Sequence, residues 1–191
     1  MERGSLVLDG DAGDFAGRGM TGGRLDLRGS VGRLAASGLR GGVVEISGDA
    51  GALLAGPLPG ERTGMDGGVV LLRGGSGAQV CDRMRRGLVV VEGDVAEHAG
   101  SRMVAGTLVV CGRVGASPGM LLRRGTVVLG HAMQAPDGFL PSGRTPGVFQ
   151  GLLAAALRPI SPAAAEVTAR AGLRLLGDQA ALGKGEMLLP G

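Results

Sequence analysis

The chain has 191 residues and a formal net charge of +3, with acidic and basic residues intermixed and no run of five like charges. Trp and Tyr are absent and Phe occurs three times, so there is little aromatic surface on which bases could stack. Charge and composition therefore exclude a nucleic-acid-binding protein. No stretch approaches the roughly 18 apolar residues that span a bilayer, and the N-terminus lacks the zones of a signal peptide. We expect no membrane partner and a cytoplasmic location.

A glycine-centred repeat of 19 residues runs through about the first 130 residues. Its opening glycine recurs at steps of 19 residues, apart from one step of 26 between Gly48 and Gly74. This opening column consists of Gly10, Gly29, Gly48, Gly74, Gly93 and Gly112. Self-similarity at such a period is typical of a solenoid, in which each unit buries its apolar side only against its neighbours.

Two more glycine columns mark the corners of each unit. The second column lies three residues after the opening glycine and consists of Gly13, Gly32, Gly51, Gly77 and Gly115. The pre-strand column consists of Gly23, Gly42, Gly68, Gly87, Gly106 and Gly125. Because glycine adopts positive φ without steric cost, we interpret all three columns as structural corners at which the backbone bends.

Short strands follow the pre-strand glycines, and their apolar residues alternate with a period of two, as in a half-buried strand. Aligning the units gives a first inward column of Leu25, Val44, Val70, Val89, Leu108 and Val127. The second inward column is Leu27, Ile46, Leu72, Val91, Val110 and Leu129. With a first strand at residues 6–8, they predict an all-β fold: a parallel β-helix with about 19 residues per coil over residues 1–135.

The longer step contains seven extra residues, 57–63, whose two prolines and glycine predict a protruding loop. Insertions in repeat arrays map to loops, often on a binding face. A neutral extension is the alternative interpretation, and the sequence leaves both open.

The outward positions of the strands are charged in the early coils and apolar in the later ones. Six of them form an apolar stripe on the predicted outer wall and are candidate interface residues: Val69, Leu71, Leu88, Val90, Val109 and Val128. Such a patch must be covered, either by the C-terminal tail folding back over it or by another subunit. The sequence leaves these two coverings equally open.

The repeat is replaced over residues 136–191 by a predicted linker, rich in proline and glycine, and a helical tail. Residues 148–157 predict a short helix that ends before Pro159. One face of this helix is formed by Phe149, Leu152, Leu153 and Ala156.

A second helix is predicted to begin after Ser161, which serves as its N-cap, with Pro162 in the first turn. We expect it to run to about Leu176, with Gly177 at its C-terminus. Residues 183–191 carry no strong signal. The two helices are expected to cap the last coil or to pack along the rod.

No recognisable catalytic constellation occurs in the sequence. The two histidines, His98 and His131, lack the spacing of a zinc site, and Cys81 and Cys111 form neither a disulfide framework nor a metal motif. His98 occupies a position held by Phe or Leu in other coils, so we expect it to pack at a corner. We predict no catalytic, cofactor-binding or metal-binding residue in this chain.

Aspartates follow several opening glycines, and Asp11, Asp49 and Asp94 invite comparison with calcium-binding β-rolls. Those proteins have a nonapeptide period, whereas the period here is 19 residues. Aspartate in a glycine-rich turn usually bonds to its own backbone, and we expect that role here.

The repeated unit Gly-Asp-x-Gly…Gly-x-x-Met-x-x-Gly-x-strand-Gly is clearest over residues 102–115 and 123–127. With the tail segments Gly138-Phe139 and Phe149-x-x-Leu-Leu, it resembles the glycine-rich repeat subunit of formylmethanofuran dehydrogenase, which also occurs in the bacterial formyltransferase/hydrolase complex. It is similar, more distantly, to the glycine-rich C-terminal domain of the glutamate synthase large chain. The resemblance covers about residues 4–160, and the chain begins almost inside the first coil, so an N-terminal portion found in family members is not matched.

The resemblance implies a right-handed β-helix with a short helical tail that acts as a structural subunit. It implies that the chemistry resides in partner subunits, one amidohydrolase-like and containing zinc, the other a formyltransferase. A methanofuran-type cofactor with a polyglutamate chain would carry the formyl group between them, and no catalytic residue is carried over to this chain.

The favoured hypothesis is a non-catalytic scaffold subunit of the formyltransferase/hydrolase complex, in formyl transfer between tetrahydromethanopterin and a methanofuran-type cofactor. The first alternative is the corresponding glycine-rich subunit of a molybdenum or tungsten formylmethanofuran dehydrogenase. The second is a β-helix that links two active sites, as in glutamate synthase. An independent enzyme is disfavoured because histidine is scarce.

Overall fold

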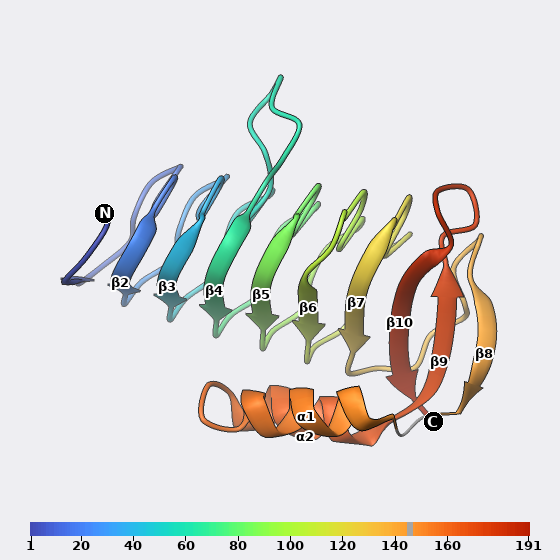
Figure 1. Ribbon diagram of the computed structural model, residues 1–191. Coiled ribbons are helices and arrows are strands. Elements are labelled where there is room, and N and C mark those ends of the chain that lie inside the picture. Colours follow the sequence, from blue (N-terminus) through green and yellow to red (C-terminus); the bar gives the residue numbers. More distant parts are fainter. Residues whose placement is uncertain (145–146) are drawn as a thin grey trace.

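The computed structural model describes residues 1–144 and 147–191, and its backbone winds as a parallel β-helix (Figure 1). The coil strands are β1 (Ser5–Leu8), β2 (Thr21–Leu27), β3 (Gly41–Ile46), β4 (Asp66–Leu72), β5 (Arg86–Val91), β6 (Thr107–Val110) and β7 (Arg124–Leu129). The C-terminal part contains β8 (Leu140–Arg144), α1 (Val148–Leu157), α2 (Pro162–Arg170), β9 (Ala171–Gly177) and β10 (Lys184–Pro190).

Strands β1 to β7 pair in parallel, each with its successor in the sequence. The register follows the alignment of the repeats. Leu25 pairs with Val44, and Val44 pairs with Val70 across the longer step. The extra residues 57–63 leave the ladder undisturbed and project as a loop ahead of β4 (Figure 1). The predicted parallel β-helix with about 19 residues per coil is confirmed.

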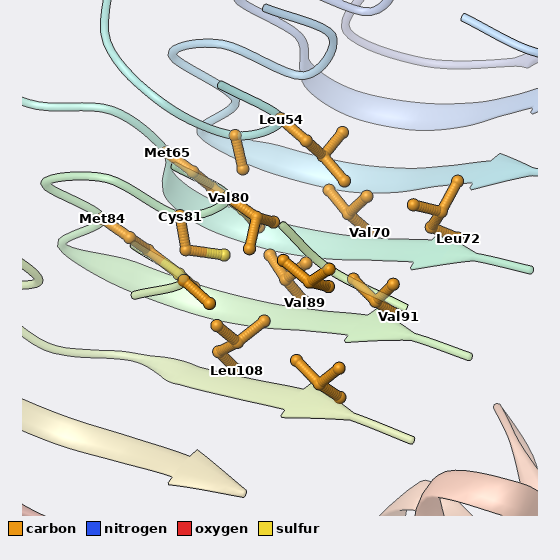
Figure 2. Close-up of a cluster of buried hydrophobic side chains, with 14 of the residues drawn as sticks. Leu54, Met65, Val70, Leu72, Val80, Cys81, Met84, Val89, Val91 and Leu108 are labelled. Carbon is orange, nitrogen blue, oxygen red and sulfur yellow. The ribbon is translucent and has the colours of Figure 1, made fainter. Parts of the chain in front are cut away.

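The two inward columns fill the interior of the solenoid. From β3 to β6 every residue of both columns has an exposed fraction of 0%. Figure 2 shows Met65 and Met84 entering the same space from the segments that precede β4 and β5. The interior is therefore an aliphatic core, which stiffens the rod.

The wall opposite the strands has an unusual backbone. Residues at alternate positions adopt the left-handed conformation, as at Leu34 (φ 61°), Ala36 (φ 54°) and Gly38 (φ 62°). The N–H of Leu34 donates to the next coil (Ala52 O, 3.0 Å), whereas that of Ala36 donates to the preceding coil (Ala16 O, 2.8 Å). Each non-glycine residue held at such φ costs on the order of 1 kcal/mol, so hydrogen bonds between coils must maintain this left-handed wall.

The glycine columns have two different physical causes. The pre-strand glycines do adopt positive φ, for example 99° at Gly106. After the first coil, the other two columns do not, contrary to our interpretation of them as positive-φ corners. At Gly32 a Cβ atom would lie 2.2 Å from Asp14 Oδ1 and 2.7 Å from Asp14 N. These glycines are required because the backbone of the preceding coil approaches too closely for a side chain.

The aspartates after the opening glycines bond to the next coil, contrary to our expectation that each would bond to its own turn. Asp11 accepts a 2.7 Å hydrogen bond from the N–H of Ser30, and Asp94 accepts one of 2.7 Å from Arg113. Asp49 accepts from the N–H of Gly75 at 2.7 Å. The column therefore links successive coils, and a neighbouring glycine leaves room for each carboxylate.

The tail differs from the sequence interpretation in its strands. The second helix ends at Arg170, and the residues predicted to continue it form β9. β10 occupies the segment without a strong signal and pairs in parallel with β7 and antiparallel with β9. β8 lies in the predicted linker and pairs with β9, while the linker residues 145–146 lie outside the described residues.

These strands close the C-terminal end of the solenoid. In the described residues the sheet order is β1-β2-β3-β4-β5-β6-β7-β10-β9-β8, so the sheet continues past the last repeat into the tail (Figure 1). Phe139, Leu175 and Met187 extend the aliphatic core with exposed fractions of 5%, 0% and 0%. The tail thus covers the core edge that the last coil would otherwise expose.

Candidate functional site

The predicted apolar stripe is covered by the chain's own tail. Val90, Val109 and Val128 are fully buried and Leu71 is 4% exposed, in a second core with residues of α1 and α2. Leu88 packs at its margin, and Val69 is half-buried. Of the two coverings left open by the sequence, the structure shows the tail. The four buried residues are therefore not available to another subunit.

Polar contacts hold the tail in this position. Ser161 donates a hydrogen bond of 2.6 Å to Glu92 on the solenoid. Gln150 of α1 is buried, and its Nε2 donates to the carbonyl oxygens of Thr168 and Ala171, both at 2.7 Å. These bonds fix α1 against α2 and α2 against the solenoid.

The outer wall of the early coils, beyond the reach of the tail, carries an ion-pair ladder. Arg24 contacts Asp26 and Glu45, and Arg73 joins Glu45 (2.9 Å) to Glu92 (2.7 Å). The hydrogen bond from Arg24 to Asp26 raises the pKa of Arg24 despite partial burial. Burial lowers the pKa of Arg73, but Glu45 and Glu92 outweigh this and raise it overall. This wall is polar where the stripe is absent.

The exposed apolar surface lies instead on α1. Val148, Phe149 and Leu152 are 82%, 50% and 66% exposed, and no residue of α1 is charged. The predicted packing face of this helix is wrong. Its buried residues are Gln150, Ala154 and Leu157, since these contact α2 and the second core.

The loop 57–63 stands at the edge of a hollow of about 550 Å³. Arg18 forms an ion pair of 3.3 Å with Glu61 of the loop, and Arg40 and Asp66 also line the hollow. Because both signs of charge are present and partly paired, this hollow has no marked preference for an anion or a cation.

The titratable residues singled out in the sequence lie apart. His98 is on the left-handed wall (φ 63°), in the column of Phe15 and Leu34, and its Nδ1 is buried without a partner among the described residues. His131 is exposed. No group of three or more His, Cys, Asp or Glu side chains suited to a metal ion occurs in residues 1–144 and 147–191.

Both cysteines are held as neutral thiols. Burial raises the pKa of Cys81, and the negative charge of Asp82 adds to the effect. Burial, then the charge of Glu92, raises the pKa of Cys111 to about 11. Because the thiolate is the nucleophilic form, neither side chain is activated near neutral pH.

Asp82 forms the most buried charged contact of the left-handed wall. Its side chain is 1% exposed, and Arg102 binds it through Nε (2.8 Å) and Nη2 (2.6 Å) while Ser101 donates at 2.9 Å. The hydrogen bond to Asp82 raises the pKa of Arg102 against the opposing effect of burial. No helix of the described chain is both long and apolar enough to cross a membrane.

No family model matches the chain, and no curated protein sequence matches it. Among solved structures, the chain is similar to one of the subunits in the crystal structure of the formyltransferase/hydrolase complex (FhcABCD) from Methylorubrum extorquens in complex with methylofuran. The TM-score is 0.92 and the sequence identity 38%, over 98% of this chain and 70% of that subunit. The chain therefore belongs to the same protein family as this subunit of the formyltransferase/hydrolase complex.

Proposed function

We propose that the chain is a non-catalytic structural subunit of a cytoplasmic formyltransferase/hydrolase complex, which transfers formyl groups between tetrahydromethanopterin and a methanofuran-type cofactor. The observation that carries this proposal is the match over 98% of the chain, at 38% identity, to a subunit of such a complex. A β-helix alone would not support it, because one fold hosts many functions.

The physical character of the solenoid suits a rigid support. Its interior is filled with aliphatic side chains, and each coil is hydrogen-bonded to its neighbours on several walls. In such an array each unit contacts only the next, so a partner bound to one wall is held at a fixed distance from a partner bound further along.

The exposed face of α1 is the surface that we assign to the interface with a partner. Val148, Phe149 and Leu152 lie within one and a half turns of an uncharged helix. Exposed apolar patches of this kind mark interaction sites. We expect this face to be covered in the assembled complex.

We assign the chemistry to partner subunits, one amidohydrolase-like and zinc-containing, the other a formyltransferase. The methanofuran-type cofactor would bind to these partners. This chain would contribute position and orientation, and would hold neither zinc nor the cofactor.

The proposal is tested by purifying an affinity-tagged chain from its own cells under native conditions, followed by native mass spectrometry and a formyl-transfer assay. We expect amidohydrolase-like and formyltransferase subunits to co-purify, and the assembly to transfer formyl groups while the isolated chain does not. Recovery of a molybdenum or tungsten dehydrogenase, or of flavin and iron–sulfur proteins, would replace the proposal with one of the alternatives. Turnover by the isolated chain would overturn its non-catalytic role.

A further inference from the structure

A groove of about 780 Å³ runs along the edge of the solenoid that carries the loop 57–63. One end is formed by this loop and the other by the turn at residues 178–183 between β9 and β10, and both rise on the same side of the molecule (Figure 1). Four arginines line it: Arg62, Arg83, Arg102 and Arg123. No carboxylate lines it.

The four guanidinium groups differ in how far they are neutralised. Arg102 is paired with buried Asp82, so it contributes little net charge. Arg83 donates only to the backbone oxygen of Glu61, at 3.3 Å. Arg62 and Arg123 are exposed and have no ion pair among the described residues. The groove therefore presents about three uncompensated positive charges.

The rest of the groove is apolar and held in place. Leu121 and Leu182 line it with exposed fractions of 40% and 52%. Asp178, at the base of the turn, accepts hydrogen bonds from the N–H groups of Leu121 (2.9 Å) and Ala180 (2.8 Å). These bonds join the turn to the solenoid, so the apolar wall lies at a fixed distance from the arginines.

We propose that this groove docks an acidic segment of a partner polypeptide that also carries apolar residues. Guanidinium groups bind carboxylates through paired hydrogen bonds, and the leucines provide contacts for aliphatic side chains between the acids. That the segment comes from another subunit of the complex rests on the proposed function. The preference of the groove for carboxylates does not.

The length of the segment follows from the repeat. Arg83, Arg102 and Arg123 come from three successive coils, and Arg62 from the loop ahead of them. Neighbouring coils are about 4.8 Å apart, so three steps span about 14 Å, which an extended chain covers with about four or five residues. A nucleic acid fits less well, because no aromatic side chain lines the groove for base stacking.

Binding is tested with the full-length chain and a fluorescein-labelled hexapeptide of glutamate and leucine, using fluorescence anisotropy. We expect saturable binding that weakens as salt is raised and that is at least about tenfold tighter than for the peptide with glutamine in place of glutamate. The double variant Arg62→Gln/Arg123→Gln should weaken binding about tenfold or more. Its matched control is Arg33→Gln/Arg113→Gln, which removes the same charge from positions outside the groove and should change binding less than about twofold.

Three results would overturn the proposal: no saturable binding, equal losses in both double variants, or equally tight binding of a labelled oligothymidylate. Circular dichroism and melting curves of both double variants establish that they remain folded. If the peptide fails to bind while the partner subunits still co-purify, the groove proposal is wrong and the proposed function stands. If the peptide binds but no such partners are recovered, the groove stands and the proposed function is wrong.

Discussion

The hydroxyl oxygen of Ser161 lies 2.6 Å from Oε1 of Glu92, to which it donates a hydrogen bond. The same oxygen accepts the N–H of Ala164 at 3.2 Å and so caps α2. Glu92 also binds Arg73 (2.7 Å), which reaches Glu45 (2.9 Å). One serine therefore connects the ion-pair ladder of the early coils to the helix that covers the apolar stripe of the later ones.

Replacing this serine should loosen the tail without disturbing the early coils. Ser161→Ala removes an N-cap, which costs about 1 kcal/mol, and a hydrogen bond to a charged acceptor, which contributes about 1.5–3 kcal/mol. We expect faster amide hydrogen exchange in α2 and an unchanged rate in β2 and β3. Ser47→Ala, at an exposed serine without a side-chain hydrogen bond among the described residues, is the control. Equal exchange in the two variants would contradict a linking role for Ser161.

A charge placed in the second core should release the helices. Val109 is fully buried beneath the tail, and Val109→Lys introduces an ammonium group without a partner. Burying an unpaired charge costs several kcal/mol, so we expect α1 and α2 to detach and become sensitive to limited proteolysis. The far-UV β signal should persist because the strands belong to the other core. If the helices remain protected, the cover is stronger than this packing indicates.

Two glycine-to-alanine changes should act in opposite directions. Gly32→Ala places a methyl group 2.2 Å from Asp14 Oδ1 and 2.7 Å from the Asp14 backbone nitrogen, so we expect a loss of about 1–3 kcal/mol through overpacking. Gly151→Ala, within α1 and with no atom within 4 Å of the added methyl, should gain about 1 kcal/mol through helix propensity. Urea denaturation measures both. A neutral Gly32→Ala would show that the coils can separate more easily than their spacing indicates.

The thiols should titrate late in the folded protein. Burial raises the pKa of Cys111 to about 11 and raises that of Cys81 further. A thiol whose pKa is higher folded than unfolded stabilises the fold while it is protonated. This stabilisation is complete below the unfolded pKa of about 8.5 and is lost as pH rises toward the folded pKa.

Thiolate ultraviolet absorbance checks this order, and the absence of Tyr removes the overlapping phenolate signal. We expect no thiolate step in the folded protein between about pH 7 and 9, and titration of both thiols near pH 8.5 in concentrated guanidinium chloride. An early step in the folded protein would place a cysteine in a more polar site than its burial indicates.

The solenoid could be predicted because its determinants are local and repeated. The period-two alternation and the glycine spacing fixed the pairing of Leu25 with Val44, and even of Val44 with Val70 across the insertion. The left-handed wall could not be predicted, since non-glycine residues such as Leu34 and Ala36 adopt positive φ only when neighbouring coils hold them there.

The tail and the groove depend on contacts between distant segments. Residues 171–176 directly follow a helix, and their apolar content is compatible with its continuation. They form β9 because β10 pairs with them and with the free edge of β7, a case in which tertiary structure overrides local propensity. The groove likewise joins Arg62 of a loop to Arg123 of a later coil, and no sequence spacing predicts that proximity.

The exposed face of α1 should affect assembly rather than folding. Leu152 is 66% exposed on a helix without charges, so Leu152→Glu should change the free energy of unfolding by less than about 0.5 kcal/mol. In the complex the same carboxylate would be buried against an apolar surface without a partner, at a cost of several kcal/mol. We therefore expect an unchanged melting curve for the isolated chain and loss of partner subunits on native purification. Ala163→Glu, which adds the same charge at an exposed position of α2, is the control, and full retention of partners by Leu152→Glu would exclude this face from the interface.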